Sequence, residues 1–439
     1  MAPPPIPSRR GVLSRARGMA VDLTPLRQSV PFRWLWSGDV FVTLGRQIPL
    51  VAIPLQVYGL TGSSLWVGLV SLVQVAPLIV GSLAGGVVVD AFDRRRVLLA
   101  TQVCLLVIAA GLAVNASVDA PRIWVIFVLA MLQAFASGFD APARRAALPQ
   151  VVPMHLLPSA LALQQILSNL GKLLVPAVTG VLIAAFGIDV VFWIYAGTFL
   201  AGLLATGRLP SMRPEGGGRK AGWSSLREGL GYVGTQPMIK AIFLLDLGAM
   251  VFGLPRALFP AIGTDVLGGD AATVGLLYSA PGAGALLGAL TSGWMARVQR
   301  IGRVIMIWVA IYGLAIVGFG TSQWLALSIA CLVLSGTADM ISATLRNTLL
   351  TVITPDPLRG RVASVNKAVV SGGPLLGDTR AGVQATLTSA GISVVTGGLA
   401  CLAGAALIAW RSPVLRRVVF RDGTLVDPRS TAGTAATRS

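Results

Sequence analysis

Ionisable side chains lie inside long apolar segments of this chain, where an isolated charge is costly to bury. Asp39 and Arg46 stand seven residues apart in one such segment, so a helix would place both on one face. A charge at membrane depth costs several kcal/mol unless it meets a partner or a water-filled cavity. Side chains of this kind therefore mark sites that handle protons or charged molecules.

Two chemistries are available to these residues. Burial favours the neutral form of a carboxyl group, so a buried aspartate can take up and release a proton. The candidates for proton exchange are Asp39, Asp246 and Asp339. Basic side chains can attract an anionic molecule into a cavity. The candidates for lining a substrate cavity are Arg46, Lys172, Arg256, Asp378 and Arg380.

Structural roles are open alternatives for several of these residues. Asp39 with Arg46, or Asp339 with Arg346, can form fixed ion pairs. Arg256 stands near the end of its segment, from which a long side chain can also reach the lipid headgroups. Asp140 lies beside Arg144 and Arg145, which favours a structural network at the inner face of the membrane.

Helices must position these side chains. Hydrophobic residues make up 54% of the 439 and charged residues 12%, whereas about a quarter of a soluble domain is charged. A helix needs about 20 apolar residues to cross a bilayer, and β-barrel strands are shorter and alternate in polarity. The sequence therefore predicts an all-α membrane protein with twelve transmembrane helices. The predicted spans are 34–58, 65–89, 96–116, 122–142, 158–186, 189–208, 239–262, 273–295, 303–321, 323–346, 362–386 and 390–411.

The net charge of +18 reflects topology. With these spans, 30 of the 35 basic residues fall in the ends and loops on one side of the membrane. Basic residues mark the cytoplasmic side, so both termini are expected in the cytoplasm and the protein in the bacterial inner membrane. The basic charge is thus not evidence for a nucleic-acid partner.

The chain divides into two halves. We expect a cytosolic tail at 1–33, with Met19 as an alternative start, six-helix halves at 34–208 and 239–411, a cytoplasmic loop at 209–238 and a tail at 412–439. Val67-Gly68-Leu69 recurs 207 positions later as Val274-Gly275-Leu276. Pro153 and Leu156 recur at an offset of 202 as Pro355 and Leu358. Parallel six-helix repeats of this kind build the major facilitator fold.

A motif in the turn between the second and third spans carries a resemblance. It runs from Gly86 through Asp90 to Arg94 and Arg95, and resembles the signature loop of the major facilitator superfamily. The resemblance implies a cytoplasmic gate in which Asp90 faces a helix N-terminus of the other half and the arginines pair across the inner face. Ala91 and Asp93 depart from the usual motif.

A finer resemblance covers most of the chain. It rests on Phe259-Pro260-Ala261, Gly288 to Gly293, Leu254 to Pro260 and Arg359-Gly360-Arg361-Val362, and is to bacterial enterobactin exporters and related drug:proton antiporters. It implies a monomeric, proton-coupled exporter of a small amphipathic molecule such as a siderophore. A broad multidrug or macrolide efflux pump is the alternative.

Other function classes lack support in the sequence. No Walker loop or metal-spaced His/Cys group is present, the three cysteines lie far apart in apolar spans, and the one histidine, His155, lies in a loop. We therefore expect no enzyme activity, no metal and no cofactor. The expected partners are a small-molecule substrate, protons and the lipid bilayer.

Overall fold

The structure is a computed structural model that describes residues 22–213, 223–412, 419–421 and 424–426. The expected tail before residue 22, with Met19, lies outside the described residues. So do 214–222 of the central loop and most of the expected C-terminal tail.

The first half contains six long helices. They are α3 (Val30–Thr61), α4 (Ser64–Ala91), α5 (Arg94–Ser117), α6 (Ile123–Val151), α7 (Leu157–Phe186) and α8 (Ile188–Thr206). A short helix, α2 (Thr24–Gln28), precedes them, and the 3-10 turn η1 (Met154–Leu156) joins α6 to α7.

The second half has the same plan with one broken span. It comprises α10 (Pro237–Phe252), η2 (Arg256–Leu258), α11 (Phe259–Ala261), η3 (Ile262–Val266), α12 (Ala271–Leu290), η4 (Ser292–Arg297), α13 (Ile301–Thr321), α14 (Leu325–Ile353), α15 (Asp356–Leu387) and α16 (Ala390–Arg411). The amphipathic helix α9 (Trp223–Thr235) precedes it. The strands β1 (Val419–Arg421) and β2 (Thr424–Val426) pair in an antiparallel manner.

Polar residues begin and end the helices. The Ser29 hydroxyl accepts the N–H of Phe32 at the start of α3, and the Ser389 hydroxyl accepts that of Ile392 at the start of α16. Gly62 ends α3 in the left-handed conformation, with φ of 60°. These contacts satisfy backbone groups at the helix ends that have no partner within the helix.

Twelve spans are present, as predicted. Within the described residues, eleven helical segments are long and apolar enough to cross a membrane. The twelfth span is α15, which is less apolar because it carries charged residues such as Lys367 and Asp378, yet it packs along α4 and α10. The predicted fold class, a major facilitator fold of two six-helix halves, is confirmed.

The seventh span is broken, whereas the sequence indicated one continuous run at 239–262. The α-helix stops at Phe252, and Pro255 cannot donate a backbone hydrogen bond to continue it. The Tyr312 hydroxyl accepts the N–H of Leu254 at 2.9 Å, which satisfies part of the break. The chain resumes as a helix at Arg256.

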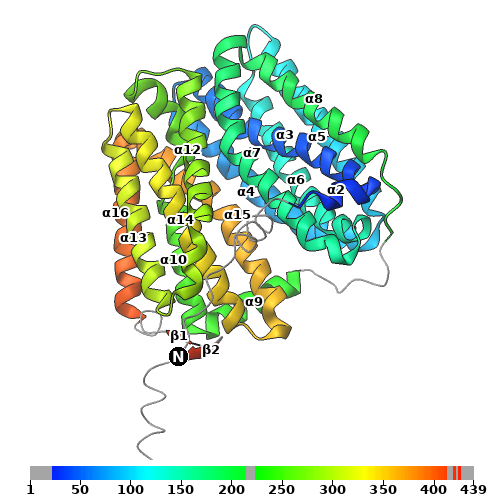
Figure 1. The fold of residues 1–439 in the computed structure, drawn as a ribbon. Coiled ribbons are helices and arrows are strands. Elements are labelled where there is room, and N and C mark those ends of the chain that lie inside the picture. Colours follow the sequence, from blue (N-terminus) through cyan, green and yellow to red (C-terminus); the bar gives the residue numbers. More distant parts are fainter. Residues whose placement is uncertain (1–21, 214–222, 413–418, 422–423, 427–439) are drawn as a thin grey trace, which may run out of the picture.

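The two halves meet mainly through two helix pairs, α4 with α15 and α7 with α12. Figure 1 shows the first bundle (blue to green) tilted against the second (green to red). We call the end where α3 begins and α16 ends the terminal end, and the other the far end. The tight contacts lie toward the far end, where Tyr58 also donates a hydrogen bond to Asp265 at 2.5 Å.

These two crossings are copies of one contact. A Cβ placed on Gly68 would lie 3.4 Å from the Cα of Gly382, and one on Gly275 would lie 2.8 Å from the Cα of Gly180. Gly68 and Gly275 differ by 207 positions, and Gly180 and Gly382 by 202, which are the offsets of the sequence repeat. We call this pair of glycine crossings the far gate.

Candidate transport site

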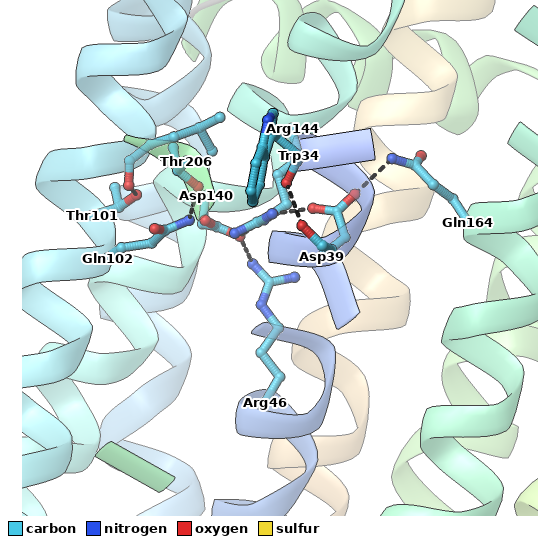
Figure 2. Close-up of polar contacts among 11 residues, drawn as sticks. Trp34, Asp39, Arg46, Thr101, Gln102, Asp140, Arg144, Gln164 and Thr206 are labelled. Atoms are coloured by element: carbon cyan, nitrogen blue, oxygen red, sulfur yellow. Dashed lines mark hydrogen bonds and ion pairs between the residues drawn. The ribbon is translucent and has the colours of Figure 1, made fainter. Parts of the chain in front are cut away.

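The first half contains a buried cluster of two acids and two bases. Arg144 on α6 lies between Asp39 of α3 and Asp140 of its own helix, and forms ion pairs with both (Figure 2). Its Nε lies 2.8 Å from the Asp140 carboxylate. Arg46 completes the cluster by pairing with Asp140, and Gln164 of α7 donates to Asp39 at 2.9 Å. Asp140 is fully buried, and both pairs are made by its Oδ2, so they replace part of its lost hydration.

This arrangement corrects part of the sequence interpretation. Asp39 and Arg46 do share a helix, but Asp39 pairs with Arg144 and Arg46 pairs with Asp140. The expected contact of Asp140 with the neighbouring arginines is present as its ion pair with Arg144, while the pairing of each of these residues with a residue of α3 was not predicted. Their spacing of four, inside a helix, is the signal that could have identified an ion pair.

The second half contains a related cluster. Arg346 of α14 lies 2.8 Å from Asp246 of α10 and 3.6 Å from Asp339 of its own helix, so Asp339 and Arg346 are within ion-pair distance, as one of the two sequence interpretations expected. Arg346 also donates to Ser342 at 2.6 Å. The contact to Asp246 is close but lacks hydrogen-bond alignment. The Asp339 side chain is 39% exposed, while the other two ions are nearly buried.

The two clusters occupy equivalent positions in the repeat. Asp39 and Asp246 differ by 207 positions, and Arg144 and Arg346 by 202. Ser342 takes the place of Asp140, which again lies 202 positions earlier. The first cluster therefore balances two acids with two bases, whereas in the second two acids share one arginine.

A cavity of about 310 Å³ lies between the halves, lined by α3, α4, α6, η2, α12 and α15. Its walls are mostly apolar, which is usual for a small-molecule site. Its polar lining includes Ser71, Gln74, Gln133, Ser137, Arg256 and Asp378. One Asp378 oxygen accepts the N–H of Ala257 at 2.9 Å, and the other lies 3.4 Å from the Ser71 hydroxyl. Asp378 on α15 therefore links the broken span of the second half to α4 of the first half.

The remaining cavity candidates separate into two groups. Lys172 has an exposed side chain and lies close enough to Arg256 and Asp339 to interact with their charges. Arg380 is directed elsewhere: it donates to the Val251 carbonyl and to Gln384, and its guanidinium lies 5.4 Å from the Phe252 ring centroid. The prediction that Arg380 lines the cavity is wrong, because α15 presents it to α10 and α16.

Within the described part of the chain, the hydrogen bonds of the gate arginines stay inside the first half. Arg94 donates to the Ala146 carbonyl at 3.0 Å and Arg95 to the Gly207 carbonyl at 2.5 Å, both within the first half. Asp90 is exposed, and a Cβ on Gly86 would meet no atom within 4 Å. The expected pairing of these arginines across the inner face is thus absent among the described residues.

Asp93, which departs from the usual motif, ties two segments together. It caps α5 through the N–H of Arg95 and accepts hydrogen bonds from the Ser211 hydroxyl, at 2.5 Å, and the Met212 N–H, at 3.1 Å. Burial raises the pKa of Asp93, but these hydrogen bonds outweigh it and hold the pKa below its ordinary value. The α4–α5 turn is thereby fixed to the segment that follows α8.

Replacing Asp93 with alanine is expected to lower the free energy of unfolding by about 0.5–2 kcal/mol, the usual cost of a lost helix cap. A lowered pKa means that the stabilisation is complete above the ordinary aspartate pKa and is lost only as pH falls through the lowered value. Thermal unfolding at pH values of about 5 and 8, both above that range, should show the same loss. Asp93→Asn, which keeps a capping oxygen, is the control. A loss confined to one of the two pH values would contradict this account.

Two bundles of six membrane helices around a central cavity define this protein as a membrane transporter of the major facilitator fold. Solved structures share the fold: a peptide transporter POT (TM-score 0.72, 12% identity, 89% of this chain and 95% of that one) and the nucleoside transporter NupG (TM-score 0.71, 15% identity, 88% and 99%). The family model MFS_3, transmembrane secretion effector, matches residues 20–418. The chain belongs to this family.

Curated relatives include the enterobactin exporters EntS. The chain is 30% identical to that of Shigella boydii serotype 18 and 31% identical to that of Citrobacter koseri, in each case over 346 residues, which are 78% of this chain and 82% of the relative. The resemblance predicted from the sequence is confirmed.

Proposed function

We propose that this protein is a proton-coupled exporter that moves a small amphipathic molecule, a siderophore or related natural product, out of the bacterial cytoplasm. Its similarity to enterobactin exporters supports the direction and the substrate class. The concentration of basic residues on one side supports a cytoplasmic location for both termini. In that orientation the far gate is the periplasmic gate, and the described conformation is closed toward the periplasm.

The observation that carries proton coupling is the sharing of Arg346 by Asp246 and Asp339. Two carboxylates share this one guanidinium, so the binding of one proton to the cluster would remove the negative charge that Arg346 leaves uncompensated. Asp339 is the partly exposed member, which makes it the acid that exchanges with water. Asp246 then acts as the fixed partner of Arg346. The first cluster, with balanced charge, serves as the structural counterpart.

The transport cycle follows from this assignment. A substrate enters the cavity from the cytoplasm while Asp339 is deprotonated. The negative charge of the substrate is offset by Arg256 and Lys172. Opening of the far gate releases the substrate and exposes the cavity to periplasmic protons. Protonation of Asp339 frees Arg346 to pair with Asp246 alone and favours return to the inward-facing state, in which Asp339 releases the proton to the cytoplasm and the next substrate binds. Two states that alternate around a fixed site are sufficient for coupled transport.

Uptake into inverted vesicles with an acidic interior tests this proposal. A pH difference of about two units is worth ~2.7 kcal/mol per proton, so one coupled proton supports about 100-fold accumulation of a fluorescent catechol siderophore. We expect Asp339→Asn to reduce this ratio to about one, while exchange without a gradient persists. Asp119→Asn, in an exposed loop, is the matched control. Gradient-dependent accumulation by Asp339→Asn would exclude Asp339 as the proton carrier.

A broad efflux pump for macrolides or other drugs is the second candidate. The apolar walls of the cavity, with Pro49, Ile53 and Leu375, favour it, because such surfaces accept varied hydrophobic molecules. The same vesicles distinguish the two functions. Accumulation of a macrolide but not of the siderophore would select the efflux pump.

A further inference from the structure

A second cavity, of about 370 Å³, lies between α14 and α15 near the terminal end. Unlike the central cavity, its lining is rich in hydrogen-bonding side chains. They are Asn347, Thr351, Thr354, Arg359 and Asn366. The residues that line it all belong to the second half, so it exists independently of contact between the halves. We call it the terminal pocket.

One buried polar group in this pocket has no partner. Thr354 is 2% exposed, and its hydroxyl makes no hydrogen bond to the part of the chain that the structure describes. A buried hydroxyl without a partner is costly, which indicates that something other than the described chain satisfies it. Because Thr354 lines the pocket, a polar group bound there is positioned to be the missing partner of this hydroxyl.

The other polar side chains are held in place around it. Arg359 donates its Nε to the Thr351 carbonyl at 3.2 Å, and its Nη1 lies 2.7 Å from the exposed carboxylate of Asp356. Asn366 donates to Asn347 at 3.2 Å across the pocket, which joins α15 to α14. The Nη2 of Arg359 and the Nδ2 of Asn347 make no hydrogen bond to the described residues, and the Asp356 side chain that pairs with Arg359 is 81% exposed. Such a set of donors suits an oxyanion.

The terminal pocket leads along α15 to the central cavity. Asn366 lines the pocket, and Val370, Pro374 and Asp378 line the central cavity. These four residues follow one another at intervals of four, so each lies one turn beyond the last in a row that winds slowly around the helix. A molecule that moves from the terminal pocket to the central cavity would pass along this row of α15, over about 18 Å.

We propose that the terminal pocket is an entry site that binds the oxyanion group of the substrate, a carboxylate, phosphate or phenolate, before its apolar body moves into the central cavity. This inference rests on the proposed export function, since it assigns the terminal end to the side from which substrate enters. It makes Arg359, Thr354 and Asn347 selectivity residues for anionic cargo.

Charge-selective thiol modification tests the pocket without any transport. In the full chain with Cys104, Cys331 and Cys401 replaced by serine, Ala363→Cys reports from the pocket lining, with Thr351→Cys as a second reporter. The protein is placed in nanodiscs, and its reaction with anionic and cationic methanethiosulfonates is measured relative to their reaction with free cysteine. We expect the anionic reagent to be favoured by about fivefold to tenfold. Arg359→Gln should remove this preference, and Asp356→Asn should raise it.

The control reporter is Met154→Cys, on an exposed turn of the first half. A pocket preference equal to that of the control, or one that survives Arg359→Gln, would show a water-filled groove and overturn the proposal. Protection of the pocket thiol only in nanodiscs that contain anionic phospholipid would assign the site to lipid headgroups and also overturn the entry role. Protection by a catechol siderophore in zwitterionic lipid would support it.

Transport separates this inference from the proposed function. In the vesicle assay, Thr354→Val and Arg359→Gln should raise the KM for the siderophore about tenfold, with Vmax within about twofold, and leave macrolide uptake unchanged. Absence of siderophore uptake by the wild type, with the thiol preference retained, would refute the export function alone. Unchanged KM in both variants would refute the entry site alone.

Discussion

Arg346→Gln is expected to abolish proton-driven accumulation and to destabilise the fold. Among the described residues it leaves Asp246, which is 5% exposed, without its ion-pair partner, and it removes the Arg346 contact of Asp339. Removing one partner of a buried ion pair costs about 3–5 kcal/mol, because the other charge stays buried. Thermal unfolding of the purified protein measures this loss, and the vesicle assay measures the loss of accumulation.

The double variant Asp246→Asn/Arg346→Gln separates stability from coupling. It removes the uncompensated buried charge, so we expect it to recover most of the lost stability but none of the proton-driven accumulation. Arg144→Gln is the matched change in the first half. In that variant Asp140 keeps Arg46 as a partner, so only Asp39 loses its ion pair. The loss of stability should therefore be smaller than in Arg346→Gln. Full accumulation by the Arg346→Gln protein would rule out this cluster as the coupling site.

The spans were the most predictable part of the molecule. Continuous apolar runs and basic loops are local properties, and the ends of the last span, 390–411, agree with α16. The break at Pro255 was missed because apolar residues continue on both sides of it and hydropathy does not register backbone hydrogen bonds. The helix α9 was missed as well, since its amphipathic pattern lies in a segment whose overall polarity indicates a loop.

The ion pairs were harder to predict, because their partners lie about 100 residues apart in sequence. Asp39 and Arg144 come from different helices, and a single sequence does not state which helices face each other. The repeat offers a way around this difficulty. Asp39 with Asp246, and Arg144 with Arg346, stand at the two offsets already visible in the glycine and proline motifs. A residue pair that recurs in both halves is a strong indication of contact.

The same repeat shows where the halves differ, and the differences coincide with the candidate chemistry. Position 140 is an acid in the first half, and its equivalent, position 342, is a serine. Asp378 stands at the equivalent of Pro176, where it binds the broken span. Structural packing favours the symmetric residues, while coupling and substrate handling require asymmetric ones, since a directional cycle must distinguish the two halves.

The far gate provides the second large effect. Gly68→Leu is expected to prevent the far end from closing, because even a Cβ there would lie 2.9 Å from the Asp378 carbonyl oxygen and a larger side chain has no room. Backbone atoms cannot move aside as a flexible side chain can. Gly275→Leu should have the same effect, since its Cβ would lie 2.6 Å from the Pro176 carbonyl oxygen. Both variants should be trapped with the far end open and transport nothing.

Accessibility of a cavity thiol measures this state. Gln74→Cys, in a chain whose native cysteines are replaced, lies in the central cavity and should react with an impermeant reagent only from the terminal end in the otherwise unchanged protein. With Gly68→Leu it should react from the far end. Gly197→Leu, at a site with no atom within 4 Å of a Cβ, is the control and should keep the original sidedness. Because the two crossings are copies of one contact, Gly68→Leu or Gly275→Leu alone should be sufficient to keep the far end open. If only one of them changed the sidedness of the reaction, the gate would open asymmetrically.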